Sequence, residues 1–173
     1  MRTRDIRSAI YLAGGLGLIV AIYTYIETVE ASLQKYCTVN SFVSCGAVAN
    51  SGYTTTFGIP DSYIGIGGFI LVLVIAGIAE TRKRELLWPY LLLIFTTAGV
   101  GFSIYFLYVE LALIHALCPV CLSAWVFGWI VWVASIALVR RVREKARDRA
   151  AQASSKGASP PENGKPKGSK STD

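Results

Sequence analysis

Two cysteines spaced three residues apart are the side chains of this chain most suited to chemistry, in the stretch Cys118-Pro119-Val120-Cys121. An apolar run, residues 122–139, follows directly. Proline is favoured as the first residue of a helix, because the N–H that it lacks would have no partner there. We therefore expect a helix to begin at Pro119, with Cys118 as its N-cap and Cys121 on the same face. The first-turn amides and the helix dipole favour an anion, so this position favours a reactive thiolate.

A second cysteine pair, Cys37 and Cys45, lies in the polar segment 28–60, which is rich in Gly, Ser, Asn and Thr. A thiolate of one pair can attack a disulfide of another pair, so electrons can pass from sulfur to sulfur. We expect the loop pair to be exposed, where a protein can reach it. Cys121 should lie about 4.5 Å deeper than Cys118 along the helix, within reach of a molecule dissolved in a bilayer.

Two other uses of the four cysteines stay open at this point. They could form two inert disulfides that staple a small bundle, although a Cys-x-x-Cys disulfide closes a very short loop and constrains the unfolded chain little. They could also bind structural zinc, although the spacing between Cys37 and Cys45 is longer than the paired short spacings of such sites.

Composition indicates a small membrane protein. The chain has 173 residues, of which 53% are hydrophobic, and its mean hydropathy is +0.48. A helix needs about 20 apolar residues to cross a bilayer core of about 30 Å. Four stretches meet this need, and they predict an all-α, integral membrane four-helix bundle with a long loop between its first two helices: 8–27, 62–79, 86–109 and 118–139. The first stretch could instead be a cleaved signal peptide, with a small-residue site near Ala31.

The basic residues predict how the bundle is oriented. Of 17 Lys and Arg residues, only Lys35 falls in the long loop; the others lie near the termini and in the turn 81–85. The positive-inside rule then places both termini in the cytoplasm and all four cysteines at the outer face. Because the cations lie at helix ends, not on an aromatic-bearing surface, nucleic-acid binding is not expected. We expect residues 1–149 to form the membrane domain and residues 150–173, rich in Ser, Pro, Gly and Lys, to be a disordered cytoplasmic tail.

Taken together, these residues resemble the vitamin K epoxide reductase family, in its prokaryotic form. The resemblance rests on Cys37, on Cys45 eight residues later, on Ser51 six residues further, and on the 118–121 motif that opens the last span. The segment 57–60, Phe-Gly-Ile-Pro, also fits. The family implies a location in the plasma membrane, or in the endoplasmic reticulum membrane of a eukaryote.

The resemblance also implies roles for the cysteines. Cys37 would exchange with a thioredoxin-fold, DsbA-like partner and share a disulfide with Cys45. Cys45 would pass electrons to Cys118, and Cys121 would reduce a membrane quinone of the ubiquinone, menaquinone or vitamin K type. The expected activity is a thiol:quinone oxidoreductase that supports disulfide-bond formation. A reductase of vitamin K epoxide or quinone is the alternative.

Three more residues are implied as quinone-site residues. Ser51 would fix the loop over the pocket. The family's pocket also uses an Asn near the start of the second span and a Tyr four residues after the last active cysteine. Asp61 and Trp125 occupy those places here. Trp125 keeps a ring and an N–H donor but lacks a phenol. The departures at Asp61 and Trp125 weaken the case for vitamin K epoxide as the substrate.

Overall fold

The computed structural model describes residues 3–30, 32–40, 42–53, 55–56, 59–82 and 86–157. Four helices in this part of the chain are long and apolar enough to cross a membrane. Their bounds are α1 Thr3–Val29, α4 Asp61–Thr81, α5 Leu87–Tyr108 and α6 Pro119–Gly157. A π-helical segment, η1 Val109–Ile114, continues α5. The predicted all-α, four-helix transmembrane bundle is confirmed.

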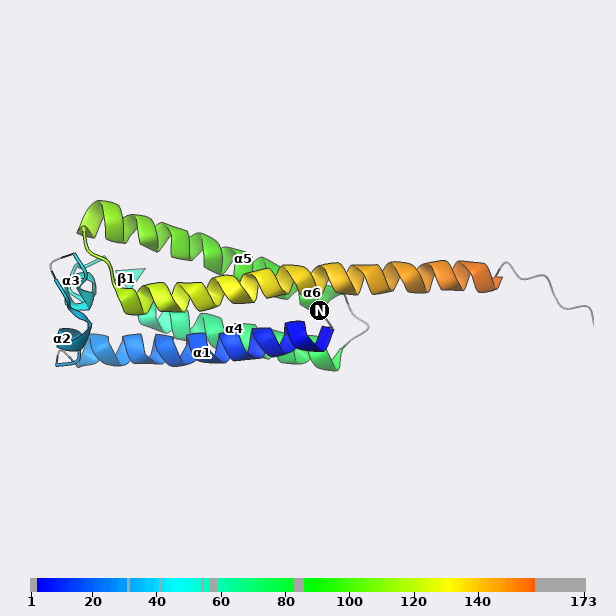
Figure 1. Ribbon diagram of the computed structural model, residues 1–173, viewed down its shortest axis with the longest axis horizontal. Helices are drawn as coiled ribbons and strands as arrows, with labels where there is room; N and C mark the ends of the chain where they lie inside the picture. The colour runs from blue at the N-terminus through cyan, green and yellow to red at the C-terminus, as the bar shows by residue number, and fades with distance from the viewer. Residues whose placement is uncertain are drawn as a thin grey trace, which may run out of the picture.

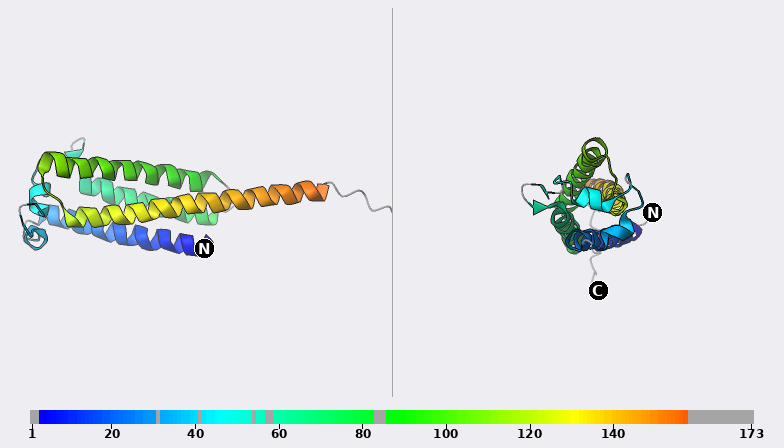
Figure 2. Two further views of the ribbon diagram at one scale, coloured as in Figure 1. Left: turned by 45° about the horizontal axis from the view of Figure 1, so that its top comes forward. Right: turned by 90° about the vertical axis from the view of Figure 1, so that its left-hand side faces the viewer.

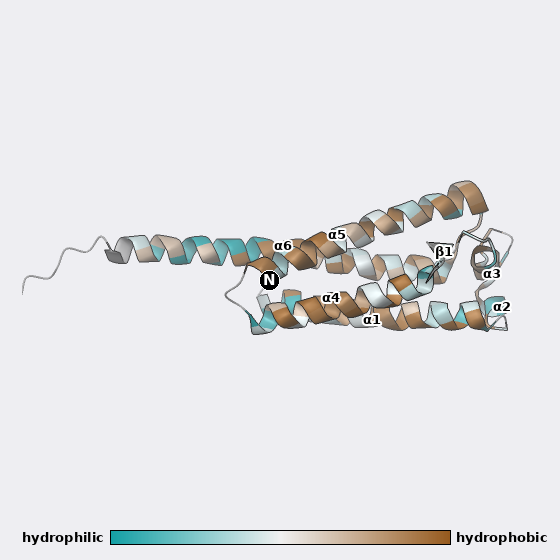
Figure 3. Ribbon diagram, turned by 180° about the vertical axis from the view of Figure 1, so that it is seen from behind, coloured by the Kyte–Doolittle hydropathy of each residue, from teal (hydrophilic) through white to brown (hydrophobic). Residues whose placement is uncertain are grey.

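The four helices form a closed ring in which α1 packs against α6 and α4, and α5 packs against α6 and α4. Figure 2 shows this ring along its axis. Its centre is filled by aliphatic side chains from different helices, including Ile10, Leu92 and Val131. The helix surfaces are also strongly apolar along most of their length (Figure 3), as a lipid environment requires.

A small cap covers one end of the ring (Figure 1). It consists of α2 Gln34–Cys37, α3 Cys45–Ala49 and two paired antiparallel strands, β1 Thr55–Thr56 and β2 Ile59–Pro60. The described part of segment 28–60 is therefore more ordered than a plain loop, because it contains two short helices and a pair of hydrogen-bonded strands. The strands are two residues long and do not alter the fold class.

The other end of the ring carries the start of α1, the end of α4 and the start of α5, and α6 projects beyond it (Figure 1). A salt bridge between Arg7 and Glu80, 3.6 Å long, joins α1 to α4 here. The Lys145 Nζ donates to Thr3 Oγ1 at 3.1 Å. All four cysteines lie at the capped end, remote from these groups. The side of the membrane that each end faces remains a prediction.

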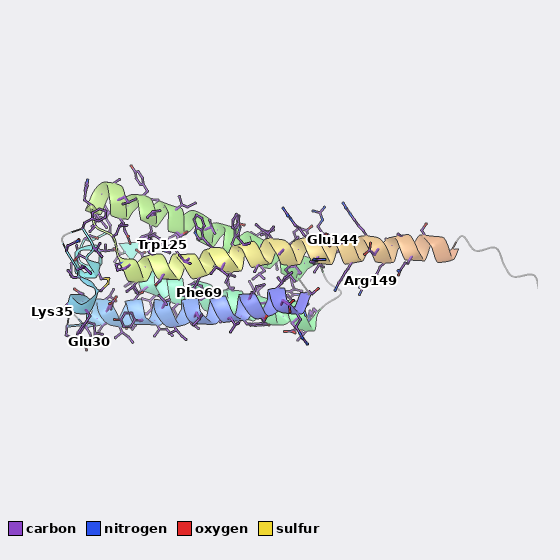
Figure 4. All side chains as sticks on the ribbon, viewed as in Figure 1. Glu30, Lys35, Phe69, Trp125, Glu144 and Arg149 are labelled. Atoms are coloured by element: carbon purple, nitrogen blue, oxygen red, sulfur yellow. A yellow bond between two sulfur atoms is a disulfide. The ribbon has the colours of Figure 1, made fainter. Side chains whose placement is uncertain are left out.

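The projecting part of α6 continues to Gly157, so the expected boundary at residue 149 falls inside a helix. Its surface is hydrophilic (Figure 3), and Glu144 and Arg149 lie on it (Figure 4). Residues 140–153 are mostly Ala, Arg, Glu, Lys and Gln, which have high helix propensity without needing a core. The rest of the predicted tail, residues 158–173, lies outside the described residues.

Close packing of α1 on α4 depends on Gly17. A Cβ atom built at Gly17 would overlap the ring of Phe69, which α4 presents to this position (Figure 4). A Cβ built at Gly15, two residues earlier on α1, meets no atom within 4 Å. Small residues at such contacts allow membrane helices to approach each other closely.

We expect Gly17→Ala to destabilise the bundle by about 1–3 kcal/mol, because the Phe69 ring must move or the helices must separate. Gly15→Ala is the matched control and should cause no loss. Thermal unfolding of the purified variants in the same detergent measures both effects. Equal unfolding temperatures for the two variants would contradict this packing.

Candidate redox site

A short parallel β-bridge joins the cap to the start of α6. Val43 pairs with Leu117, and two backbone hydrogen bonds connect these segments: Ser44 N–H to Leu117 O, 3.1 Å, and Leu117 N–H to Phe42 O, 2.7 Å. The bridge ends one residue before a cysteine on each segment, Cys45 on one and Cys118 on the other. It therefore fixes the two cysteines side by side, although 73 residues separate them in sequence.

Local capping shapes the cap segment for this pairing. The Asn40 Oδ1 accepts from the N–H groups of Phe42 and Val43, at 2.9 and 2.7 Å, and so closes a tight turn before the bridge. The Ser44 hydroxyl accepts from Ala47 N–H at 3.1 Å and is the N-cap of α3. Cys45 is consequently the first residue of α3, held between the bridge and a capped helix start.

The bridge brings three sulfur atoms together. Cys37 and Cys45 form a disulfide, with their Cα atoms 5.7 Å apart, and Cys118 and Cys121 are free thiols. The Cys45 Sγ lies 3.3 Å from the Cys118 Sγ. The sulfurs of Cys37, Cys45 and Cys118 all lie within 4.8 Å of one another.

The expectation that the loop pair is exposed was wrong. Cys37 is 8% exposed and Cys45 is 3% exposed, as is Cys118. These three side chains pack with Val48 and Ala116 in an apolar cluster of their own. The reason is the bridge, which pulls the cap onto the mouth of α6 and buries the sulfurs between them.

Helix α6 begins at Pro119, as the sequence predicted. The Cys118 sulfur accepts a hydrogen bond from the Cys121 backbone N–H at 3.3 Å, in the manner of an N-cap side chain. The Cys121 thiol also hydrogen-bonds the Cys118 sulfur, and this contact, with the backbone N–H, lowers the pKa of the Cys118 thiol. Burial and the charges of two acidic side chains oppose the shift. Cys118 is therefore the thiolate-prone member of its pair.

One of those acids, Glu110, lies beneath the motif. It is 1% exposed, and its Oε2 accepts from the Cys118 backbone N–H at 3.2 Å. Its backbone carbonyl accepts from Ala116 N–H at 3.1 Å. The π-helical turn η1 carries Glu110, and His115 ends that turn in the left-handed region, with φ 54°. π-Helical turns and left-handed non-glycine residues are both enriched at functional sites.

The second acid is Glu27, near the end of α1, and it is 3% exposed. Its Oε1 is buried without a hydrogen-bond partner among the described residues. Gln34 of α2 links the end of α1 to the end of α3. Its Nε2 donates to the Glu27 backbone carbonyl at 3.1 Å, and its Oε1 accepts from the Asn50 side-chain amide at 3.3 Å. Neither acid was predicted as a site residue. The available signal was an acidic residue at the end of an apolar span, which is costly and therefore usually functional.

The three predicted quinone-site residues lie in different places. The Ser51 hydroxyl donates to Val48 O at 2.7 Å and accepts from Tyr53 N–H at 3.4 Å, so it closes the chain after α3. Asp61 is the first residue of α4, directly after β2. Trp125 lies one helical turn beyond Cys121 on α6 (Figure 4). A role for these residues in quinone binding remains a prediction.

Trp125 also lines a large apolar cavity. This cavity has a volume of about 840 Å³ and extends between α1, α5 and α6. It runs from Leu122 and Trp125 near the cysteines to Ala137 near the opposite end of the ring. A long apolar groove of this volume suits a hydrophobic small molecule or a lipid chain.

The arrangement of the four cysteines and a match to a protein-family profile indicate the same family. The profile of the "Vitamin K epoxide reductase family" matches residues 8–136, which include the four cysteines and most of the transmembrane bundle. The chain belongs to the vitamin K epoxide reductase family. Membership in this family makes it an oxidoreductase that couples thiols to a quinone-type substrate.

The sulfur geometry predicts a specific cross-link. In the double variant Cys37→Ala/Cys121→Ala, the remaining Cys45 and Cys118 should form a disulfide under mild oxidation, because their sulfurs already lie in contact. The variant Cys37→Ala/Cys118→Ala, which retains Cys45 and Cys121, is the matched control and should oxidise much more slowly. Intact mass under non-reducing conditions, with alkylation of free thiols, measures both. Faster disulfide formation in the control would show that Cys45 lies closer to Cys121 than to Cys118 and would contradict the geometry.

Proposed function

We propose that this protein is a quinone-dependent thiol oxidase, which reoxidises a secreted thioredoxin-fold, DsbA-like partner and reduces a membrane quinone. One observation carries the proposal: the 3.3 Å contact between Cys45 of the cap pair and Cys118 of the helix pair. Thiol–disulfide exchange requires such a contact, since a thiolate must attack a disulfide sulfur directly. The contact supports a single electron path through the two pairs.

The reaction proceeds by four sulfur exchanges. The reduced partner attacks the Cys37–Cys45 disulfide at Cys37 and releases the Cys45 thiolate. Cys45 attacks Cys118 of the Cys118–Cys121 disulfide and releases the Cys121 thiolate. The partner's second thiol then frees Cys37, and Cys37 attacks Cys45 and releases the Cys118 thiolate. The partner leaves as a disulfide, and both electrons now reside on the helix pair.

The quinone completes the cycle. The Cys121 thiolate adds to the quinone ring, and the Cys118 thiolate attacks the Cys121 sulfur, so that the S–S bond reforms and the hydroquinone leaves. Two electrons and two protons move from the partner dithiol to the quinone in each cycle. Just before this step the proposal has Cys37–Cys45 closed and the helix pair reduced, and the pairing in the structure supports it, with a Cys37–Cys45 disulfide and free Cys118 and Cys121 thiols.

Exposed side chains near Cys37 support docking of a protein partner at the cap. Tyr36 and Val39 flank Cys37 on its own segment and are strongly exposed, and Phe42 and Tyr53 add exposed rings on neighbouring parts of the cap. Apolar side chains of this size, exposed outside the spans, are typical of a protein contact surface. A partner there would reach Cys37 before any other cysteine.

The choice of oxidant follows from redox poise. A DsbA-type partner has a reduction potential of about −120 mV and is already a strong oxidant, so an ordinary protein disulfide cannot reoxidise it. A quinone can. Cys121 lies at the bilayer end of the relay, and Trp125 beyond it begins the apolar groove, which offers a path for a hydrophobic substrate.

Turnover with purified components tests the proposal. Full-length protein, a reduced thioredoxin-fold partner and a quinone should give quinone reduction that depends on the partner. Cys37→Ala should abolish partner-driven turnover but retain turnover with dithiothreitol, which can reach the helix pair directly. Cys118→Ala should abolish both, because Cys121 then has no resolving thiol. Quinone absorbance measures all of these rates.

The same assay separates the other readings. Reduction of vitamin K epoxide by partner thiols, without efficient quinone turnover, would replace the oxidase with the epoxide reductase. Absence of any thiol-dependent quinone reduction in the wild-type protein would contradict both. Two inert staples would give no thiol-dependent quinone reduction, and the free Cys118 and Cys121 thiols of the structure support the exchange chemistry instead.

A further inference from the structure

A buried carboxylate, Glu110, lies beside the dithiol and has no role in the sulfur exchanges. Its Oε2 accepts the Cys118 N–H at 3.2 Å, and its side chain is nearly inaccessible to solvent. A buried ionised carboxylate is costly unless it is well paired, and one backbone N–H compensates only part of that cost. A glutamine would accept the same N–H without a charge. Fixing the Cys118 backbone therefore does not by itself explain a carboxylate at this position.

Titratable groups surround Glu110 from two directions. Cys118 and Cys121 lie at the start of α6, and Glu27 approaches from α1; the charges of Glu110 and Glu27 both act on Cys118 and Cys121. His115, at the end of η1, is exposed. In so confined a cluster, a second negative charge is disfavoured, so a thiolate and an ionised Glu110 compete. Formation of a thiolate thus favours uptake of its proton by Glu110.

We propose that Glu110 is the proton-holding residue of the helix dithiol: it takes up a proton when a thiolate forms and returns it when the hydroquinone forms. This inference rests on the proposed function. The thiols of Cys118 and Cys121 lose two protons and two electrons as they close their disulfide. The quinone gains the two electrons, and its two oxygens gain the two protons. Glu110 holds one of these protons after it leaves the thiol and before it reaches a quinone oxygen. Glu110 acts through Cys118, so it is a positioning residue that also holds a proton.

The first measurement needs no quinone. Full-length protein with the Cys37–Cys45 disulfide intact is treated with iodoacetamide across a range of pH, and fragment mass spectrometry resolves alkylation at Cys118 from that at Cys121. Glu110→Gln keeps the acceptor for the Cys118 N–H but cannot hold a negative charge. The midpoint of Cys118 alkylation should therefore move to lower pH by about one unit. A curve identical to that of the wild-type protein would overturn the proposal.

The second measurement is quinone reduction driven by dithiothreitol. Glu110→Gln should lower kcat by about 100-fold, the usual size of a lost proton-transfer group, and flatten the pH profile of kcat. Unchanged kcat and pH profile would overturn the proposal even if the alkylation curve moved. Absence of quinone reduction in the wild-type protein would contradict the proposed function instead, and the alkylation result would still decide whether Glu110 shares its proton with the dithiol.

The matched control is Glu144→Gln on the projecting part of α6, where Glu144 is exposed and pairs with Arg141 at 3.7 Å. It removes the same charge far from the cysteines, so it should leave both curves at their wild-type positions. Thermal unfolding checks that Glu110→Gln folds, which is expected because the Cys118 N–H keeps its acceptor. Equal shifts in both variants would mean a general charge effect and would overturn the assignment to Glu110.

Discussion

The β-bridge between residues 42–44 and Leu117 is the contact on which the site depends. Two backbone hydrogen bonds bind a cap segment to the residue before Cys118. Backbone pairing of this kind has a fixed register, because a one-residue slip would turn every side chain to the other face. The register observed here places Cys45 against Cys118, and it also buries the cap pair. Specific electron transfer and protection from solvent thus have the same structural cause.

Electrostatics at the mouth of α6 balance two opposing effects. The helix start and the Cys121 thiol stabilise a thiolate on Cys118, whereas burial and the charges of Glu110 and Glu27 oppose it. A thiolate that is too stable is a poor nucleophile, and one that never forms does not react. Opposed contributions therefore suit a sulfur that must attack and then leave in each cycle. The same opposition gives the buried acids a place in proton movement.

Features that depend on local sequence were predictable. The four spans follow from apolar runs, and the start of α6 follows from Pro119, whose position is favoured only in a first helical turn. The cysteine spacing indicated the family, which the match over residues 8–136 establishes. These features require only neighbouring residues or a fixed spacing.

Features that depend on distant contacts were not predictable. The bridge between Val43 and Leu117 brings together Cys45 and Cys118, which are 73 positions apart. Nothing in the polar composition of residues 28–60 indicates that this segment folds onto α6. Burial of Cys37 follows from that contact and was missed with it. Glu110 gave a weak signal as an acid beside an apolar span, but its hydrogen bond to the Cys118 N–H requires the π-helical turn, for which the sequence shows no signature.

The most direct test of the account is to observe the link between the two pairs during turnover. Wild-type protein, oxidised at both pairs, is mixed rapidly with reduced partner and quinone, quenched with acid and alkylating agent, and mapped by non-reducing mass spectrometry. The account predicts a transient Cys45–Cys118 disulfide that rises before the quinone absorbance falls and decays as the hydroquinone forms. Quinone reduction that proceeds without this species, or through a Cys45–Cys121 or Cys37–Cys118 link, would contradict it.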